Sequence, residues 1–314
     1  MSGGSRRAAS AEARVGWAFV APQALGMLVF FLVPLGVSLY YTFTKWDLIA
    51  PRPTFVGWDN WAYLLQDERI ARVLANTLRF VLFGTTGFLV LALLMALLLR
   101  SGRGGTGGYR ALFILPFVLS AAGVGTIWRW VLNDRAGPIA QALDIFGIDS
   151  PQWLFDPKWA MIAIAIATTW QSLGFGMAIL LAGLQDIPEH LYEAARLDGA
   201  SRLQQFRYVT LPDLAPVLLF LTVTSLIAAL QLYDPVVAMT VDGFGNTAAA
   251  GGPQDSTRTI VLYLYNQMFQ YNEAISGLGY ASTIAWFLAL ITIGFTAAQW
   301  LIFQSRNFRR KGNS

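Results

Sequence analysis

The chain has 314 residues, of which 55% are hydrophobic and 13% are charged, and its formal net charge is +4 at pH 7. So few charges cannot cover a soluble protein of this size, and the apolar residues lie in runs of about 20 or more, the length that crosses a bilayer. From these runs we predict an all-α integral membrane protein. The sequence has no cysteine, which excludes disulfides, thiolate catalysis and cysteine-based metal sites.

Six apolar runs follow one another along the chain, and we predict that each is a transmembrane helix. A tail rich in Ser, Ala and Arg at 1–14 precedes the first run, which is too long for a cleavable signal peptide. The runs lie at residues 15–43, 75–99, 109–131, 159–184, 215–237 and 280–303. We expect a transmembrane domain at 15–305 and a basic cytoplasmic tail at 306–314.

Lysine and arginine are distributed unequally between the two sides that six spans define. The two tails and the second and fourth connectors hold 13 of the 22, whereas the alternate connectors hold 7. Because positive charge concentrates on the cytoplasmic side, this pattern places both termini in the cytoplasm. The outer connectors are rich in aromatic residues and are predicted to form short surface helices at 60–65 and 259–269, with a flexible Gly/Ala-rich loop at 243–252.

Several polar side chains interrupt the fourth and fifth runs. In hydrocarbon such groups face the interior of the helix bundle, where they pair with one another or line a cavity. They alternate with aromatic residues, and aromatic faces beside hydrogen-bonding groups suit a sugar ring. Ordinary hydrogen bonding between helices is the alternative. The polar residues are Thr168, Thr169, Gln171, Ser172, Ser225 and Gln231, with Asp234 near the outer end of the fifth run, and the aromatic ones are Trp170, Phe175 and Tyr233.

The connector at 186–212 is built like a helical hairpin. Asp186 and Glu189 have the spacing of a capping box, and a second box is predicted at 201–204. Gly199 stands where a helix stops in a left-handed residue. A helix lying flat on the membrane is the alternative, which acids such as Glu193 and Asp198 disfavour because an anionic leaflet repels them. We therefore predict a cytoplasmic knob that docks on another protein. The residues predicted to share one small, flat face of its first helix are Ile187, Leu191, Ala194 and Ala195.

The sequence offers no recognisable site for ATP. It has no G-x-x-x-x-G-K-[ST] motif, and the G-x-G-x-x-G match at 102–107 follows an apolar run rather than a β-strand. His190 is the single histidine, and no cysteine or second histidine exists to complete a metal site. We predict a transport subunit that is not an enzyme, with no catalytic residue, metal or cofactor of its own, so that any ATP and Mg²⁺ are bound by a partner chain.

Short motifs of the hairpin carry a resemblance to a known family. Glu193-Ala194-Ala195, Asp198-Gly199-Ala200 and Leu211-Pro212 resemble the EAA loop of inner-membrane permeases of binding-protein-dependent ABC importers. Further motifs, from Phe55-Val56-Gly57 to Gly279-Tyr280-Ala281, are similar to the carbohydrate-uptake branch of that family. This branch includes permeases for maltose, multiple sugars and glycerol-3-phosphate, and the resemblance covers roughly residues 15–305.

The resemblance implies a set of partners. A second permease subunit completes the pathway as a heterodimer, two cytoplasmic ABC ATPase subunits dock on the hairpins, and an extracytoplasmic sugar-binding protein delivers the solute. It also implies a multi-pass protein of the bacterial cytoplasmic (inner) membrane, with no nucleic-acid partner. Carried over position by position, the residues that couple to the ATPase are Glu193, Ala194, Ala195, Asp198, Gly199 and Pro212.

The resemblance also implies where the sugar lies, between the third, fourth and fifth spans. The corresponding positions are Phe117, Thr168, Gln171, Ser172, Phe175, Ser225 and Gln231. The chain departs from the family pattern at 241–257, where a short Gly-Gly-Pro connector is expanded. Two alternatives stay open: a permease for glycerol-3-phosphate or a polyol, and an autonomous ion-coupled carrier, which needs an intramembrane acid or an inverted repeat.

Overall fold

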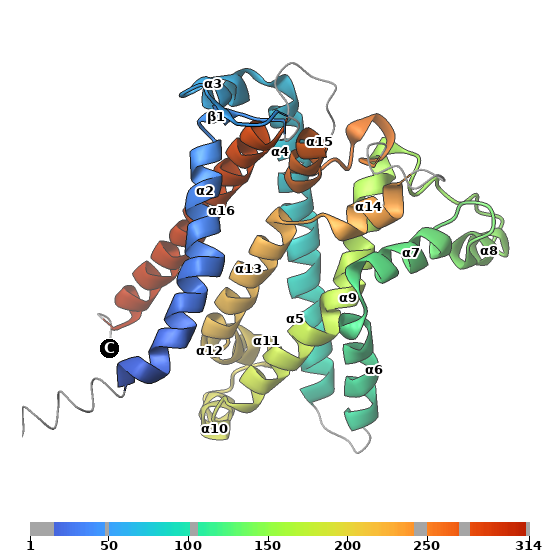
Figure 1. Cartoon of the computed structure of the whole chain (residues 1–314). Coiled ribbons are helices and arrows are strands. Elements are labelled where there is room, and N and C mark those ends of the chain that lie inside the picture. Colours follow the sequence, from blue (N-terminus) through green and yellow to red (C-terminus); the bar gives the residue numbers. More distant parts are fainter. Residues whose placement is uncertain (1–15, 48–49, 101–105, 242–249, 270–276, 312–314) are drawn as a thin grey trace, which may run out of the picture. The chain divides into compact units, whose positions relative to one another are not determined.

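The computed structural model describes residues 16–47, 50–100, 106–241, 250–269 and 277–311 (Figure 1). These residues fall into two compact units. The first unit contains the described residues up to 66 together with 267–286, and the second contains 67–266 and the described residues from 287 onward. Helices long and apolar enough to span a membrane are Gly16–Tyr41, Glu68–Arg100, Pro157–Gln185 and Leu278–Phe303. If each of two bent helix pairs counts as one span, the described residues hold up to six.

A buried asparagine organises the first unit. Its elements are η1 (Leu28–Leu32), α2 (Val33–Tyr41), the antiparallel strands β1 (Thr44–Lys45) and β2 (Thr54–Phe55), α3 (Asp59–Gln66) and the start of α16 (Leu278–Lys311). Asn60 donates through Nδ2 to the carbonyl oxygens of Thr42 (2.9 Å) and Thr44 (2.8 Å), in the segment that leads from the end of α2 into β1. The short helix predicted at 60–65 is confirmed as α3.

The second unit is built around α9 (Pro157–Gln185), a helix of 29 residues (Figure 1). Packed beside it are the continuous stretch of α4 (Glu68–Phe80), η2 (Val81–Thr85) and α5 (Thr86–Arg100), then α6 (Thr106–Val118) and α13 (Ala215–Leu230). α6 approaches α9 so closely that a Cβ on Gly174 would overlap the carbonyl group of Phe113, so this position requires glycine. Phe88 and Met177 are buried in the apolar core between α5 and α9.

Two of the six predicted runs are not single straight helices. The third, predicted at 109–131, turns by 102° between α6 and α7 (Ala121–Val131). Ser120 accounts for the turn, because its backbone is extended (ψ 143°) and its Oγ accepts a hydrogen bond from the Gly123 N–H (3.2 Å) as the cap of α7. The fifth, predicted at 215–237, ends at Leu230 and resumes as α14 (Asp234–Thr240). The prediction of one continuous helix was wrong at both places.

The remaining elements are short or lie near the ends of the long helices. They are α8 (Pro138–Asp144), α10 (Glu189–Leu197), α11 (Arg202–Gln205), η3 (Phe206–Thr210), α12 (Leu211–Asp213), η5 (Pro253–Asp255) and α15 (Ile260–Phe269). The helix predicted at 259–269 is confirmed as α15. Most of the loop predicted at 243–252 and the whole tail at 1–14 lie outside the described residues. The backbone of α16 stays helical as far as Lys311, within the predicted basic tail.

Candidate functional site

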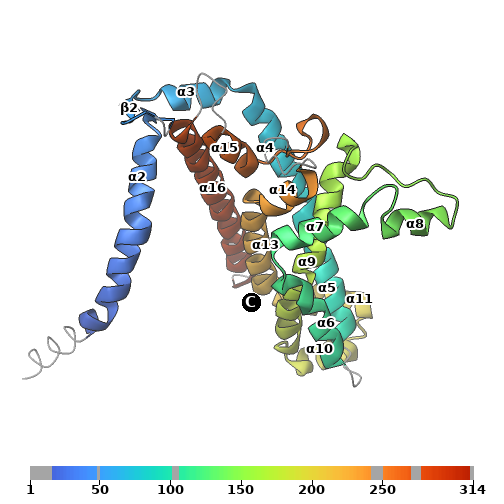
Figure 2. The same ribbon diagram turned by 45° about the vertical axis from the view of Figure 1, so that its right-hand side comes forward.

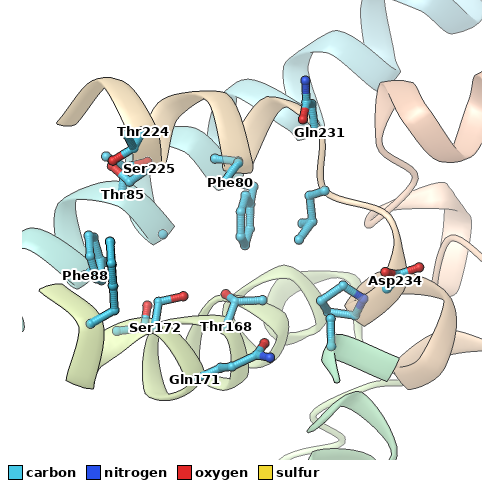
Figure 3. A pocket seen from close by; sticks show the side chains of 18 of the residues that line it. Phe80, Thr85, Phe88, Thr168, Gln171, Ser172, Thr224, Ser225, Gln231 and Asp234 are labelled. Atoms are coloured by element: carbon cyan, nitrogen blue, oxygen red, sulfur yellow. The ribbon is translucent and has the colours of Figure 1, made fainter. Parts of the chain in front are cut away.

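A cavity of about 440 Å³ lies within the second unit, between the α4–η2–α5 stretch, α9 and the end of α13 (Figure 3). All seven residues predicted to contact a sugar line it: Phe117, Thr168, Gln171, Ser172, Phe175, Ser225 and Gln231. They come from three segments that are separated in the sequence by about 50 residues each. The structure therefore brings the whole predicted set together around one space.

The two helix breaks form part of the cavity wall. Where α6 ends, the carbonyl oxygen of Leu119 has no helical donor and accepts a hydrogen bond from Gln171 Nε2 at 2.9 Å. Close to this break, the rings of Phe117 and Phe175 stack with their centroids 4.9 Å apart and their planes 14° from parallel. Where α13 ends, Gln231 takes a non-helical conformation (φ −96°, ψ 14°) and lines the cavity beside the start of α14.

The hydroxyl groups around the cavity are bound mainly to their own helices. Thr168 Oγ1 donates to the carbonyl of Ile164 (2.9 Å), and Ser225 Oγ donates to that of Thr222 (3.2 Å). Each oxygen keeps lone pairs that can accept a hydrogen bond from a solute. The alternative interpretation was that these polar groups form ordinary hydrogen bonds between helices. Among the described contacts of the seven predicted sugar residues, only the bond from Gln171 to Leu119 is of that kind.

Other cavity residues were not included in the predicted set. Thr85 is one, and its Oγ1 is buried without a hydrogen-bond partner among the described residues. It lies in η2, a π-helical turn that changes which side chains of the run face inward, and no local sequence signal marks that turn. Phe80, Phe88 and Thr224 also line the cavity, and so do Thr169, Tyr233 and Asp234, which the sequence pattern of the fourth and fifth runs had already marked. Trp170, from the same pattern, does not line it and packs edge-on against Trp128, with the ring centroids 5.8 Å apart.

The hairpin that follows α9 is described in full. Pro188 is the N-cap of α10, and Asp186 is the C-cap of α9, so the predicted capping box of Asp186 and Glu189 was wrong. Gly199 is left-handed (φ +76°) as predicted. The N–H of Ala200 donates to the carbonyl of Ala195 (2.9 Å), which closes the Schellman turn that ends the helix.

The second capping box is confirmed, and it opens the return helix of the hairpin. Gln204 N–H donates to Ser201 Oγ (3.4 Å), while the Ser201 N–H donates to Gln204 Oε1 (2.7 Å). The chain then passes through α11, η3 and α12, and it bends by 66° into α13. Pro212 lies at the start of α12, close to that bend.

The exposed face of α10 differs from the face predicted. Ile187 is buried and Leu191 is half-buried, because both pack on the apolar core of the second unit. Glu193 and Ala194 are exposed, as is Leu197 at 89%. The surface available to a partner therefore combines small, acidic and apolar side chains. In Figures 1 and 2, α10 lies at the end of α9 away from α14.

A network of hydrogen bonds holds α10 against neighbouring helices. Arg100, the last residue of α5, donates from Nη1 to Tyr192 Oη at 2.8 Å, and its guanidinium carbon lies 4.5 Å from the centre of the tyrosine ring. Tyr192 Oη is also 2.9 Å from Thr210 Oγ1, and Thr210 is buried in η3. Because Arg100 has only donors, the tyrosine hydroxyl accepts from it and is free to donate to Thr210.

The model of the family "Binding-protein-dependent transport system inner membrane component" matches residues 27–307. The chain is 34% identical over 301 residues to the probable ABC transporter permease protein YesP of Bacillus subtilis, covering 93% of each. It is 32% identical to the lactose transport system permease protein LacF of Rhizobium radiobacter, covering 93% of the chain and 94% of LacF.

A solved structure shares the fold. It is that of a bacterial ABC transporter involved in the import of the acidic polysaccharide alginate, and one of its chains superposes with a TM-score of 0.76 at 22% identity, covering 94% of this chain and 96% of the other. At that identity the likeness concerns the arrangement of helices, and the solute must be argued from the cavity.

Proposed function

Because the chain belongs to the family of inner membrane components of binding-protein-dependent transport systems, we propose that it is one permease subunit of an ATP-driven importer for a sugar. Such a subunit is a transport component and not an enzyme. The cavity is the observation that supports a sugar as the solute, because hydroxyl and amide groups line it together with the stacked rings of Phe117 and Phe175. A sugar has apolar ring faces and a rim of hydroxyls, and this lining complements both.

In this proposal the chain crosses the bacterial inner membrane six times, with both termini in the cytoplasm. The two bent helix pairs supply the third and fifth spans, which is consistent with up to six spans in the described residues. The unequal distribution of Lys and Arg supports the orientation. Residues 1–14 and 306–314 are the cytoplasmic tails, and residues 15–305 form the transmembrane domain.

The hairpin is proposed to be the coupling site for an ATPase subunit. Its residues at that contact are Glu193, Ala194, Ala195, Asp198, Gly199 and Pro212. Glu193 can pair with a basic residue of the ATPase, and the small side chain of Ala194 allows close approach. ATP and Mg²⁺ belong to that partner, and a second permease subunit and an extracytoplasmic binding protein complete the importer.

The hairpin and the cavity share their supporting helices, which gives the coupling a physical route. α9 carries Thr168, Gln171 and Ser172 and runs directly into α10. The return limb runs through η3 and α12 into α13, which carries Ser225. A displacement of the hairpin is therefore transmitted to both of these cavity walls.

Affinity purification of the tagged chain from its native membrane, followed by mass spectrometry and a sugar screen on the co-purified binding protein, tests the proposal. We expect a second permease, an ABC ATPase and a binding protein that retains a sugar. Recovery of the chain without an ATPase, together with gradient-driven uptake by the chain alone, would overturn it.

A further inference from the structure

A single acid stands out in the cavity. Asp234 is the only charged residue among those that line it, and no lysine or arginine is among the described lining residues. Its carboxylate is exposed, and among the described residues it forms no ion pair. Figure 3 shows Asp234 and Gln231 toward one end of the cavity and the hydroxyls of Thr85, Thr224 and Ser225 toward the other.

The backbone that carries the carboxylate is held by the fold around it. Asp234 is the first residue of α14, and Pro235 and Val236, which follow it, are buried. α14 in turn packs on α7, the second half of the bent third run. The position of Asp234 at the rim of the cavity is therefore set by the packing of its own backbone.

Two consequences follow for a solute. A carboxylate has two acceptor oxygens, so it can take hydrogen bonds from two adjacent hydroxyls of a sugar ring, and such charge-assisted bonds are about twice as strong as neutral ones. The same charge repels a carboxylate or phosphate on the solute. No cation among the described lining residues offsets it.

We propose that Asp234 is a substrate-binding and selectivity residue, and that the cavity takes uncharged sugars and excludes uronates and phosphorylated polyols. This inference rests on the proposed function as a sugar permease. A cationic solute is disfavoured because the polar groups are spread along the cavity, at both of its ends, as a polyhydroxylated ring requires. The cavity would thus differ in selectivity from importers of acidic polysaccharides that share the fold.

The test uses the complete importer, purified with its partner chains and reconstituted in proteoliposomes. The probes are radiolabelled trehalose and lactose as neutral sugars, and digalacturonate and glycerol-3-phosphate as anions. We expect ATP-dependent uptake of a neutral probe and none of the anions. Asp234→Asn should lower neutral uptake about tenfold, since it removes a charged acceptor, and Asp234→Glu should retain part of it. The isolated binding protein is titrated with each probe, so that its own selectivity is known.

Asp144→Asn is the matched control. Asp144 is an exposed acid at the end of α8 that does not line the cavity, so its neutralisation makes the same change in net charge. Co-purification with the partners reports whether each variant is folded. Equal uptake by Asp234→Asn and Asp144→Asn, or anion uptake as fast as neutral uptake in the wild type, overturns the inference while leaving the sugar permease intact. ATP-independent uptake, or no ATP-dependent uptake of a neutral probe that the binding protein binds, overturns the proposed function and the inference with it.

Discussion

Tyr192 connects three segments that meet at the base of the second unit. Its hydroxyl lies 2.8 Å from Nη1 of Arg100 and 2.9 Å from Oγ1 of Thr210, and its ring lies under the guanidinium. These contacts join the end of α5, the middle of α10 and the π-helical turn η3. Since α5 continues the stretch that carries Thr85, one hydroxyl links the hairpin to a cavity wall that α9 does not supply.

Tyr192→Phe removes that hydroxyl and keeps the ring under Arg100. A hydrogen bond to a charged group contributes about 1.5–3 kcal/mol, so its loss should loosen the hairpin without unfolding the bundle. We expect fewer sugars transported per ATP hydrolysed, measured as the ratio of uptake to phosphate release in proteoliposomes. Tyr208→Phe is the control, because Tyr208 is 69% exposed on the same hairpin. Equal ratios for both variants would remove Tyr192 from the coupling route.

The shape of the hairpin depends on one residue in the left-handed conformation. Gly199 has φ +76°, and its N–H donates to the carbonyl of Arg196 at 3.1 Å. Together with the bond from Ala200 to Ala195, this ends α10 and directs the chain into the second capping box. The position therefore fixes the angle between the two limbs of the hairpin.

Gly199→Pro should uncouple transport while leaving the chain inserted in the membrane. Proline fixes φ near −65° and has no N–H, so both features of the turn are lost. ATP-dependent uptake should fall at least about tenfold, the equivalent of about 1.4 kcal/mol, with unchanged amounts of chain in the membrane fraction. Gly147→Pro is the comparison, because Gly147 is also left-handed (φ +67°) but follows α8. Wild-type uptake in Gly199→Pro would contradict the role given to the turn.

The break between α6 and α7 leads to a prediction for Gln171, which donates a hydrogen bond to it. Gln171→Ala removes the donor to the Leu119 carbonyl and a polar group of the cavity. Sugar uptake should fall about tenfold, whereas the stability of the purified complex should change by only about 1 kcal/mol. The matched control is Gln141→Ala, since Gln141 donates to the Ala136 carbonyl (3.1 Å) outside the cavity. A loss of stability with normal uptake would assign Gln171 to structure alone.

How far the sequence predicts these elements depends on the range of the interactions. The stop at Gly199 and the Ser201–Gln204 box are made by residues within a few positions of each other, so the pattern revealed them. The 102° bend lies inside a long apolar run, where Ser120 is the one local signal, and α7 beyond it packs against α9 and α14, which no local pattern records. Thr85 was missed for the same reason, because η2 shifts the inward face of its helix.

On the scale of the whole molecule, the second unit joins a cavity to a docking hairpin through shared helices. α9 enters the hairpin and α13 leaves it, and both line the cavity. The sequence lacks a phosphate-binding motif, so in our proposal the energy for transport enters through the hairpin from a partner ATPase. The seven predicted sugar residues meet at the cavity, and their roles in binding are predictions that transport assays must test.

The most direct test of this account is uptake of a radiolabelled neutral sugar by proteoliposomes that contain the chain with its co-purified partners. We predict uptake when the ATPase side is supplied with hydrolysable ATP and the binding protein is present on the other side, and none with a non-hydrolysable analogue. Uptake by the chain alone, driven by an ion gradient and independent of ATP, would contradict the account.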